Sequence, residues 1–248
     1  MNTLLAACMF FTRLPFWKIK EVPSECFKSV VNYWAYVGWL TGGVMALILW
    51  LSSFVLPFPV AVILALCSRL LITGALHEDG LADFMDGFGG GTDRTRILAI
   101  MKDSHIGSYG VIGLIIYFLF LYTMLCQLPL YVACIVLLAG DCWSKFVASN
   151  LINFLPYARK EEDSKAKMVY KRMSVRNFFV AAMGGGLWVL ILLPGWYCLA
   201  CFLPVLVFGG LVWLMWKKIQ GYTGDCCGAT FLLCELSFYF GINILYRL

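Results

Sequence analysis

The sequence predicts an all-α, polytopic integral membrane protein with about seven transmembrane helices and cytoplasmic active-site loops. The first observation is composition. Of the 248 residues, 62% are hydrophobic and 13% are charged, whereas soluble domains average roughly 45–50% apolar and 25% charged residues. The second is a series of apolar runs close to the ~20 residues that a helix needs to cross a bilayer. The third is the confinement of most charges to the segments between these runs.

The apolar runs divide the chain into spans and polar connections. No long polar linker interrupts the runs, so we expect residues 1–248 to form a single membrane domain. The candidate spans are 30–56, 58–76, 108–128, 130–153, 177–196, 198–216 and 227–246. The polar parts are an N-terminal interfacial segment at 1–29 and three loops, the acidic and glycine-rich 77–107, the basic 154–176 and the second motif loop 217–226.

Basic residues predict the orientation of the chain. Most of the 19 Lys and Arg residues lie in the N-terminal segment and in the three polar loops. All four segments fall on one side of the bilayer if there are seven spans. The positive-inside rule then places the N terminus and these loops in the cytoplasm and the C terminus outside. We expect contacts with membrane lipid, and the net charge of +5, spread over short loops, does not indicate a nucleic-acid-binding protein.

The stretch HEDGLADFMDGFGGG, residues 77–91, carries the strongest sign of chemistry. On a helix, Asp79, Asp83 and Asp86 fall within an arc of about 60° and span about 10 Å of the axis. Like charges at this spacing destabilise a helix, whereas a divalent cation would neutralise them, and carboxylate oxygens suit Mg²⁺. The alternative is a solvated acidic face near a helix N terminus.

The residues after these acids add features of a phosphate site. Glycines including Gly89 and Gly90 are expected to end the helix and to let backbone N–H groups approach an anion. Arg94, Arg96 and Lys102 add positive charge. The combination indicates Mg²⁺ bridging to phosphate oxygens, although a glycine run alone is also typical of a flexible linker.

The stretch IMKDSHIGSYG, residues 100–110, supplies further candidates. Asp103 could bind the metal, and Ser104 could contact substrate or cap the next helix. The only two histidines, His77 and His105, fall in the same predicted loop, which favours a catalytic or phosphate-contact role.

Charged residues inside the spans are expected to face the protein interior. Asp141 and Lys145 stand at i, i+4 and are expected to pair. Glu235 is expected to act as a structural partner of Arg69 or Lys145.

These motifs resemble the cobalamin synthase family, the adenosylcobinamide-GDP ribazoletransferases. The family pattern is similar to HEDGLADFMDG together with IMKDSHIG, and FFTRLP, LPYAR and GYTGDCCGATFLLCEL resemble its other motifs in the same order. Three positions depart from the pattern. Glu78 replaces an apolar residue, and His105 and Lys145 stand where arginine is common, so a bidentate phosphate contact is lost at Lys145.

The resemblance implies an enzyme of the prokaryotic inner membrane that joins adenosylcobinamide-GDP to α-ribazole or its 5′-phosphate and releases GMP. Mg²⁺ would be the cofactor, and other cobalamin-assembly enzymes are possible partners. The site set expected from motifs and resemblance has three parts. Catalytic residues are Asp79, Asp83, Asp86 and His77; metal ligands are Asp79, Asp83, Asp86, Asp103 and Asp225; substrate-binding residues are Arg94, Arg96, Lys102, Ser104, Gly89 and Gly90.

Two other classes remain open from the sequence. A CDP-alcohol phosphotransferase also uses carboxylates one helical turn apart, but the Ala-Arg of its usual signature is missing after Asp79-Gly80. An ion-coupled transporter could use the acids as cation sites, although such sites usually lie near the bilayer midplane.

Overall fold

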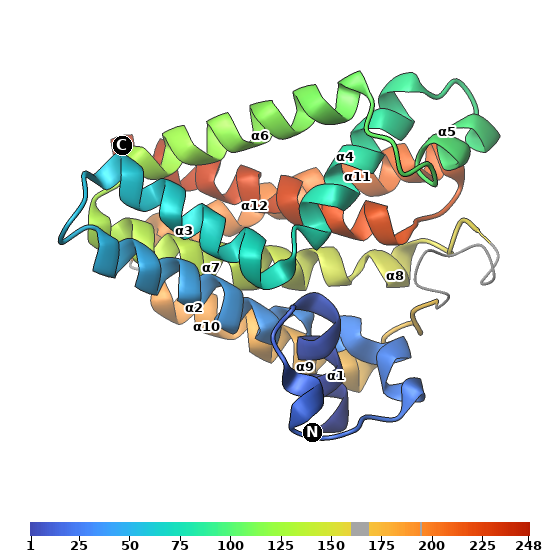
Figure 1. Ribbon diagram of the computed structural model, residues 1–248, viewed down its shortest axis with the longest axis horizontal. Coiled ribbons are helices and arrows are strands. Elements are labelled where there is room, and N and C mark those ends of the chain that lie inside the picture. The colour runs from blue at the N-terminus through green and yellow to red at the C-terminus, as the bar shows by residue number, and fades with distance from the viewer. Residues whose placement is uncertain (160–168, 194) are drawn as a thin grey trace.

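The computed structural model describes residues 1–159, 169–193 and 195–248, and these form a bundle of helices (Figure 1). The N-terminal elements are α1 (Asn2–Phe11), η1 (Phe16–Lys18) and η2 (Ser24–Tyr33). The first half of the bundle contains α2 (Trp34–Ser52), α3 (Phe58–Thr73), α4 (Leu76–Gly90), α5 (Arg94–Ile100) and α6 (Ser108–Cys126). The second half contains α7 (Leu130–Ser149), α8 (Leu151–Phe154), α9 (Val175–Ala182), the π-helical turn η4 (Met183–Leu187), α10 (Trp188–Leu192), η5 (Gly195–Cys201), α11 (Phe202–Ile219) and α12 (Gly224–Arg247).

The helices confirm the predicted class. Within the described residues, six helical segments are long and apolar enough to cross a membrane, and a bent pair brings the number to as many as seven. The six are Ser24–Ser52, Ser108–Cys126, Leu130–Phe154, Val175–Leu192, Gly195–Ile219 and Gly224–Arg247. Each overlaps a predicted span, because each is an apolar run of about 20 residues.

The second predicted span, 58–76, coincides with α3 over most of its length and forms one arm of a bent pair of helices. The chain forms α3, turns sharply after Thr73 and continues as α4, and the two helices are bent by 91°. Gly74 and Ala75 both adopt left-handed backbone conformations, with φ of 65° and 55°. The side chain of Arg13 covers this turn so closely that a Cβ on Gly74 would lie 1.9 Å from its Nε. Glycine therefore meets both the conformational and the steric demand at this corner.

The predicted loop 77–107 was wrong, because most of it is helical. The helix that begins at Leu76 continues through Gly87 and Gly89 and ends at Gly90, within the glycine run, with Gly91 as its C-cap. Glycine serves helix packing here, since a Cβ on Gly87 would lie 2.4 Å from the Met101 side chain and one on Gly89 2.6 Å from the Tyr109 ring. The polar connections that remain are the short segments 91–93 and 101–107.

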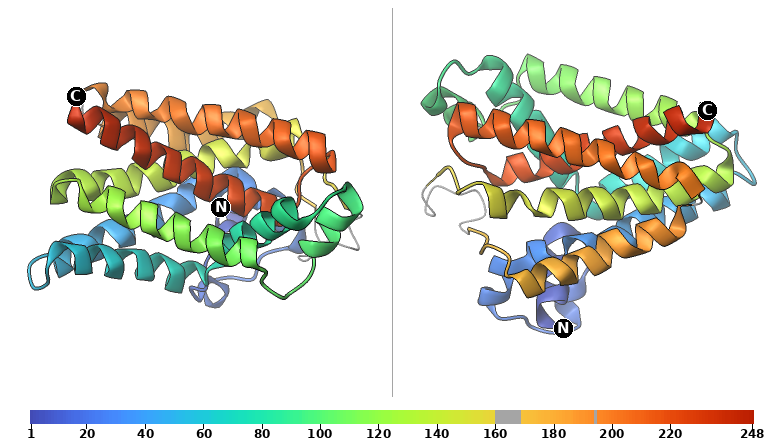
Figure 2. Two further views of the ribbon diagram at one scale, coloured as in Figure 1. Left: turned by 90° about the horizontal axis from the view of Figure 1, so that it is seen from above. Right: turned by 180° about the vertical axis from the view of Figure 1, so that it is seen from behind.

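The connections separate into two groups, as the charge pattern predicted. In Figure 1, α5 and the α11–α12 connection lie at one end of the bundle, and the α2–α3 connection and the C terminus lie at the other. The view from above in Figure 2 shows the same separation. Part of the basic loop 154–176 lies outside the described residues, including Lys160, Lys165 and Lys167. The N-terminal segment packs against the bundle, where the Phe11 ring stacks on Trp34 with centroids 5.0 Å apart.

The charges inside the bundle are paired, as expected. Nη1 of Arg69 lies 2.6 Å from both carboxylate oxygens of Glu235, and the hydroxyls of Tyr117 and Tyr239 donate to the same carboxylate. Lys145 pairs with Asp141, and Thr41 on α2 joins this pair. Buried charges need partners of this kind. The two networks therefore tie α3 to α12 and α2 to α7.

Candidate functional site

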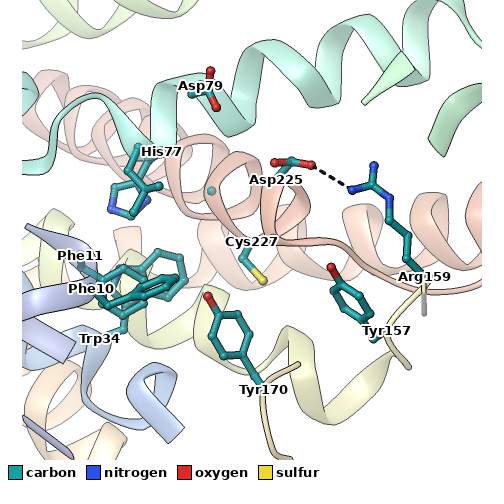
Figure 3. A pocket seen from close by; sticks show the side chains of 13 residues that line it. Phe10, Phe11, Trp34, His77, Asp79, Tyr157, Arg159, Tyr170, Asp225 and Cys227 are labelled. Atoms are coloured by element: carbon teal, nitrogen blue, oxygen red, sulfur yellow. Dashed lines mark ion pairs between the residues drawn. The ribbon is translucent and has the colours of Figure 1, made fainter. Parts of the chain in front are cut away.

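A cavity of about 130 Å³ lies where the N-terminal segment, α4 and the start of α12 meet (Figure 3). Its lining combines acids, a guanidinium and aromatic rings from parts of the chain that are distant in sequence. The lining residues are Phe10, Phe11, Trp34, Leu76, His77, Asp79, Tyr157, Arg159, Tyr170, Gly224, Asp225, Cys227 and Gly228.

Close packing of α4 on α12 brings two of the predicted acids to this cavity. A Cβ on Gly80 would lie 3.0 Å from the carbonyl oxygen of Asp225, and one on Gly228 would lie 3.1 Å from that of His77. Glycines in both helices thus allow the backbones to approach. Asp79 and Asp225, which are 146 positions apart, consequently line the same cavity.

The start of α12 is fixed by a side-chain cap. Thr223 precedes the helix, and its hydroxyl oxygen accepts a hydrogen bond from the backbone N–H of Cys226 at 3.3 Å. Such a cap satisfies one of the free N–H groups of the first turn. Asp225 stands in that turn, where the positive end of the helix dipole favours a carboxylate or another anion.

Arg159 is held beside Asp225 by the backbone of its own loop. The loop pairs with the residues before α12, as Ala158 N donates to Tyr222 O at 2.8 Å and Tyr222 N donates to Pro156 O at 2.9 Å. Nη2 of Arg159 donates to Leu98 O at 3.0 Å, and Nη1 lies 4.0 Å from a carboxylate oxygen of Asp225. One side of the guanidinium is thereby anchored while the other faces an acid of the cavity (Figure 3).

His77 lies on the other side of the cavity, among aromatic rings. Its ring centroid is 5.3 Å from that of Trp34 and 5.0 Å from that of Phe231. The side chain is buried, and its Nε2 has no hydrogen-bond partner among the described residues. Asp79, two positions further along the same helix, is exposed, whereas His77 is buried.

Asp86 and Glu78 are occupied by contacts inside the protein. The two carboxylate oxygens of Asp86 accept hydrogen bonds from Gly107 N at 2.7 Å and Gly110 N at 2.8 Å. Asp86 therefore anchors the first turn of α6, where N–H groups have no partner within the helix. Glu78 is buried, and its carboxylate lies 3.4 Å from Nη2 of Arg69. Neither carboxylate lines the first cavity.

Asp103 belongs to a second cavity, of about 470 Å³, that Asp86, Arg96 and His105 also line. The carboxylate of Asp103 contacts Nδ1 of His105 at 2.6 Å and accepts the backbone N–H of the same residue at 3.0 Å. These hydrogen bonds lower the pKa of the Asp103 carboxyl below its ordinary value. The five acids predicted as metal ligands are thus divided, and the described residues contain no preassembled group of three or more His, Cys, Asp or Glu side chains around a metal site.

The predicted substrate-binding residues are also divided. Arg94 links two connections, because its Nε donates to Ile219 O at 2.9 Å and its Nη2 to Ala158 O at 3.0 Å. Lys102 and Ser104 are exposed in the segment before α6. Gly90 lines the second cavity, whereas Gly89 packs on Tyr109.

Reasoning from the sequence missed Arg159 and most of the aromatic lining. A signal was present, because Phe10 and Phe11 lie at FFTRLP and Arg159 ends LPYAR, the two short motifs that resemble the family. Neither motif contains an acid, whereas the predicted site residues all lie in or beside acidic stretches of the chain. Trp34 and Tyr170 carry no comparable signal.

The fold and the site define a class, a polytopic membrane protein with a cavity lined by carboxylates, arginine and aromatic rings at the start of two packed helices. The family model described as cobalamin-5-phosphate synthase matches residues 3–243. The chain therefore belongs to the cobalamin-5-phosphate synthase family.

Curated relatives agree over nearly the whole chain. An adenosylcobinamide-GDP ribazoletransferase of Shewanella sp. strain W3-18-1 is 38% identical over 243 residues, covering 96% of this chain and 92% of the relative. A protein of the same name from Shewanella oneidensis is 37% identical over 244 residues, covering 97% and 93%. No solved structure matches the chain. These findings favour neither the CDP-alcohol phosphotransferase nor the transporter.

Proposed function

We propose that this chain transfers the adenosylcobinamide phosphate group of adenosylcobinamide-GDP to a ribose hydroxyl of α-ribazole or of its 5′-phosphate. The products are GMP and adenosylcobalamin or its 5′-phosphate. The names of the relatives support the reaction. The single structural observation that supports it is the cavity that brings Asp79, Asp225 and Arg159 together beside an aromatic wall.

The reaction exchanges one P–O bond for another. The oxygen of the ribose hydroxyl bonds to the phosphorus of the adenosylcobinamide phosphate group, and the bond from that phosphorus to the GMP oxygen breaks. The bonding electron pair leaves with GMP, and the hydroxyl loses its proton. Catalysis of such a transfer rests mainly on positioning and on neutralising charge.

The donor set fits Mg²⁺ as a cofactor that arrives with the diphosphate. Mg²⁺ in such sites is held by one or two carboxylates, with water and phosphate oxygens as the other ligands. Asp79 and Asp225 line the cavity, and Asp83 stands one helical turn beyond Asp79 on α4. We assign these three residues as the ligands. When bound, the ion would polarise the phosphoryl oxygens and neutralise part of their charge.

Two side chains have further roles in this proposal. Asp79 accepts the hydroxyl proton, because its side chain is exposed at the cavity and no hydrogen bond or ion pair engages the carboxylate among the described residues. Arg159 stabilises the charge on the departing GMP, because its Nη1 lies at the cavity while Nη2 is fixed to Leu98 O. A guanidinium suits this task because it remains charged and presents a rigid set of donors.

The proposal includes the cell membrane as the location, with the site end of the bundle in the cytoplasm. The grouping of polar connections at one end supports it. A reporter that is active only in the cytoplasm should be inactive when fused after Leu248, and activity there would contradict this orientation. Membrane lipid and other cobalamin-assembly enzymes are the proposed partners.

A reconstitution assay tests the function. The purified protein in lipid is incubated with adenosylcobinamide-GDP, α-ribazole 5′-phosphate and Mg²⁺, and GMP and the cobalamin product are measured. The wild type should form both in equal amounts, and Asp79→Asn should form neither above background. No product from folded wild-type protein, under conditions in which the Shewanella relative is active, would overturn the proposal.

A further inference from the structure

Two buried ring nitrogens, in side chains that line the cavity, lack hydrogen-bond partners among the described residues. They are Nε2 of His77 and Nε1 of Trp34, and no described residue bonds to either. Both side chains are almost fully buried and line the same cavity. Buried polar groups are nearly always paired, and the indole N–H of a buried Trp usually finds an acceptor. Two unpaired nitrogens at one cavity therefore indicate that an acceptor comes from a ligand.

The walls of the cavity indicate what kind of ligand this is. In Figure 3, Phe10, Phe11, Trp34 and Tyr170 gather on one side, and Asp79, Asp225 and Arg159 lie on the other. Aromatic side chains offer faces on which flat heterocycles stack. The cavity measures about 130 Å³, less than the roughly 300–1,000 Å³ of pockets for drug-sized ligands. This volume is of the size of one small bicyclic ring, so the aromatic side can hold a single base while the rest of the substrate extends beyond it.

We propose that the aromatic side of this cavity binds the planar heterocyclic base of the ribazole substrate, with His77 and Trp34 as hydrogen-bond donors to its ring nitrogen. This assignment rests on the proposed function and says which part of which substrate the cavity takes. An indole nitrogen is a donor only, and neutral imidazole can present a donor at Nε2. A benzimidazole-type base whose other nitrogen carries the ribose has one acceptor nitrogen and no donor, so the two N–H groups would share its single lone pair.

The polar side of the cavity agrees with this orientation. With the base against the aromatic rings, its ribose extends toward Asp79 and Asp225. The attacking hydroxyl then lies beside the carboxylate proposed to accept its proton and close to the proposed diphosphate position. A guanine fits less well, because its edge offers donors as well as acceptors and the aromatic side of the lining contains no carboxylate or amide.

The test separates the two substrates kinetically. Trp34→Phe and His77→Phe keep an aromatic ring and remove the donor. Loss of one such hydrogen bond should raise KM for α-ribazole 5′-phosphate about tenfold and leave KM for adenosylcobinamide-GDP within about twofold. His77→Gln, which retains an N–H donor, should restore part of the loss. The matched control is Trp39→Phe on the same helix, whose indole N–H instead donates to Gly184 O, and it should leave both KM values unchanged.

A substrate analogue identifies the atom involved. With an indole riboside phosphate, in which C–H replaces the ring nitrogen, the penalty of both donor variants should vanish. A rise in KM for adenosylcobinamide-GDP instead would assign the cavity to guanine, and unchanged KM values would show that it holds only water. Either result would overturn the inference while wild-type turnover leaves the proposed function intact.

Equilibrium binding of α-ribazole 5′-phosphate to the folded variants, measured by calorimetry, repeats the comparison without turnover. Equal affinity for the wild type and both donor variants would overturn the inference even if no product forms.

Discussion

The acids of α4 lie in two regions, and their roles in these regions differ. At the start of the helix, Asp79 meets α12, where Asp225 and Arg159 surround a cavity that can receive a ligand. Two turns later, Asp86 meets α6, and backbone N–H groups occupy both of its oxygens. The residues share a helix face, and the neighbouring element decides what each one does. The comparison teaches that helical spacing identifies candidates for a site and does not show that they act together.

The largest effect is expected at Asp79. Asp79→Asn should lower kcat by about 10³-fold or more, because it removes the proposed proton acceptor and metal ligand, while the thermal unfolding temperature stays near that of the wild type. The matched control is Asp103→Asn in the second region, which should keep turnover within about threefold, since the exposed Asp103 contacts His105. Similar losses of turnover in both variants, measured as GMP release at saturating Mg²⁺, would contradict the claim that only the first region takes part in the reaction.

Arg159 should show the next largest effect. Arg159→Met keeps much of the length of the side chain and removes the charge beside Asp225. We expect kcat/KM for adenosylcobinamide-GDP to fall about 10²-fold, as for loss of one donor to developing charge. Arg96→Met, at the second cavity, should change the same value by about twofold or less. A large fall in kcat/KM in Arg96→Met together with a small one in Arg159→Met would instead assign the diphosphate of the substrate to the second cavity.

Asp86 should affect stability more than chemistry. Asp86→Ala leaves the N–H groups of Gly107 and Gly110 without their acceptor, which should cost about 1–3 kcal/mol of unfolding free energy. Turnover per folded molecule, measured well below the unfolding temperature, should change only a few-fold. Asp86→Asn retains one acceptor oxygen and should lose less stability. Abolished turnover with unchanged stability would restore Asp86 as a metal ligand.

The smallest effect concerns pH and Asp103. Hydrogen bonds from His105 depress the pKa of this carboxyl, so its contribution to stability is present above the ordinary Asp pKa of about 3.9 and is lost as pH falls through the lower folded value. Wild type and Asp103→Asn should therefore differ in thermal unfolding temperature at neutral pH, and the small difference should fade below about pH 4. A difference in unfolding temperature between wild type and Asp103→Asn that grows on acidification would contradict this prediction.

Much of the architecture could be predicted from apolar length and charge. Spans such as 130–153 were recognisable because a run of about 20 apolar residues has few alternatives to a membrane helix. The Asp141–Lys145 pair followed from i, i+4 spacing. The bend between α3 and α4 was missed because it depends on Arg13 covering Gly74, a contact between segments 61 positions apart.

The site was predictable only in part, for a related reason. Asp79 and Asp225 were expected in one site from separate motifs, and they line one cavity. The glycines after Asp86 were interpreted as a turn because glycine often ends helices, and α4 does end at Gly90. Gly87 and Gly89 lie inside the helix instead, where their missing side chains make room for Met101 and Tyr109. The aromatic wall could not be predicted, because its residues come from the N-terminal segment, α2 and a loop that meet only in the folded chain.

Metal binding tests the central claim most directly. Mn²⁺, which shares the preference of Mg²⁺ for oxygen ligands, can be titrated by electron paramagnetic resonance with pyrophosphate present as the diphosphate probe. Mutation of residues that only support metal ligands typically lowers metal affinity about 10–100-fold. Loss of a proposed direct ligand in Asp79→Asn or Asp225→Asn should therefore weaken Mn²⁺ binding at least about tenfold, and Asp103→Asn should leave it unchanged. Weakened binding in Asp103→Asn together with unchanged binding in Asp79→Asn would contradict the assignment of the metal to the cavity between α4 and α12.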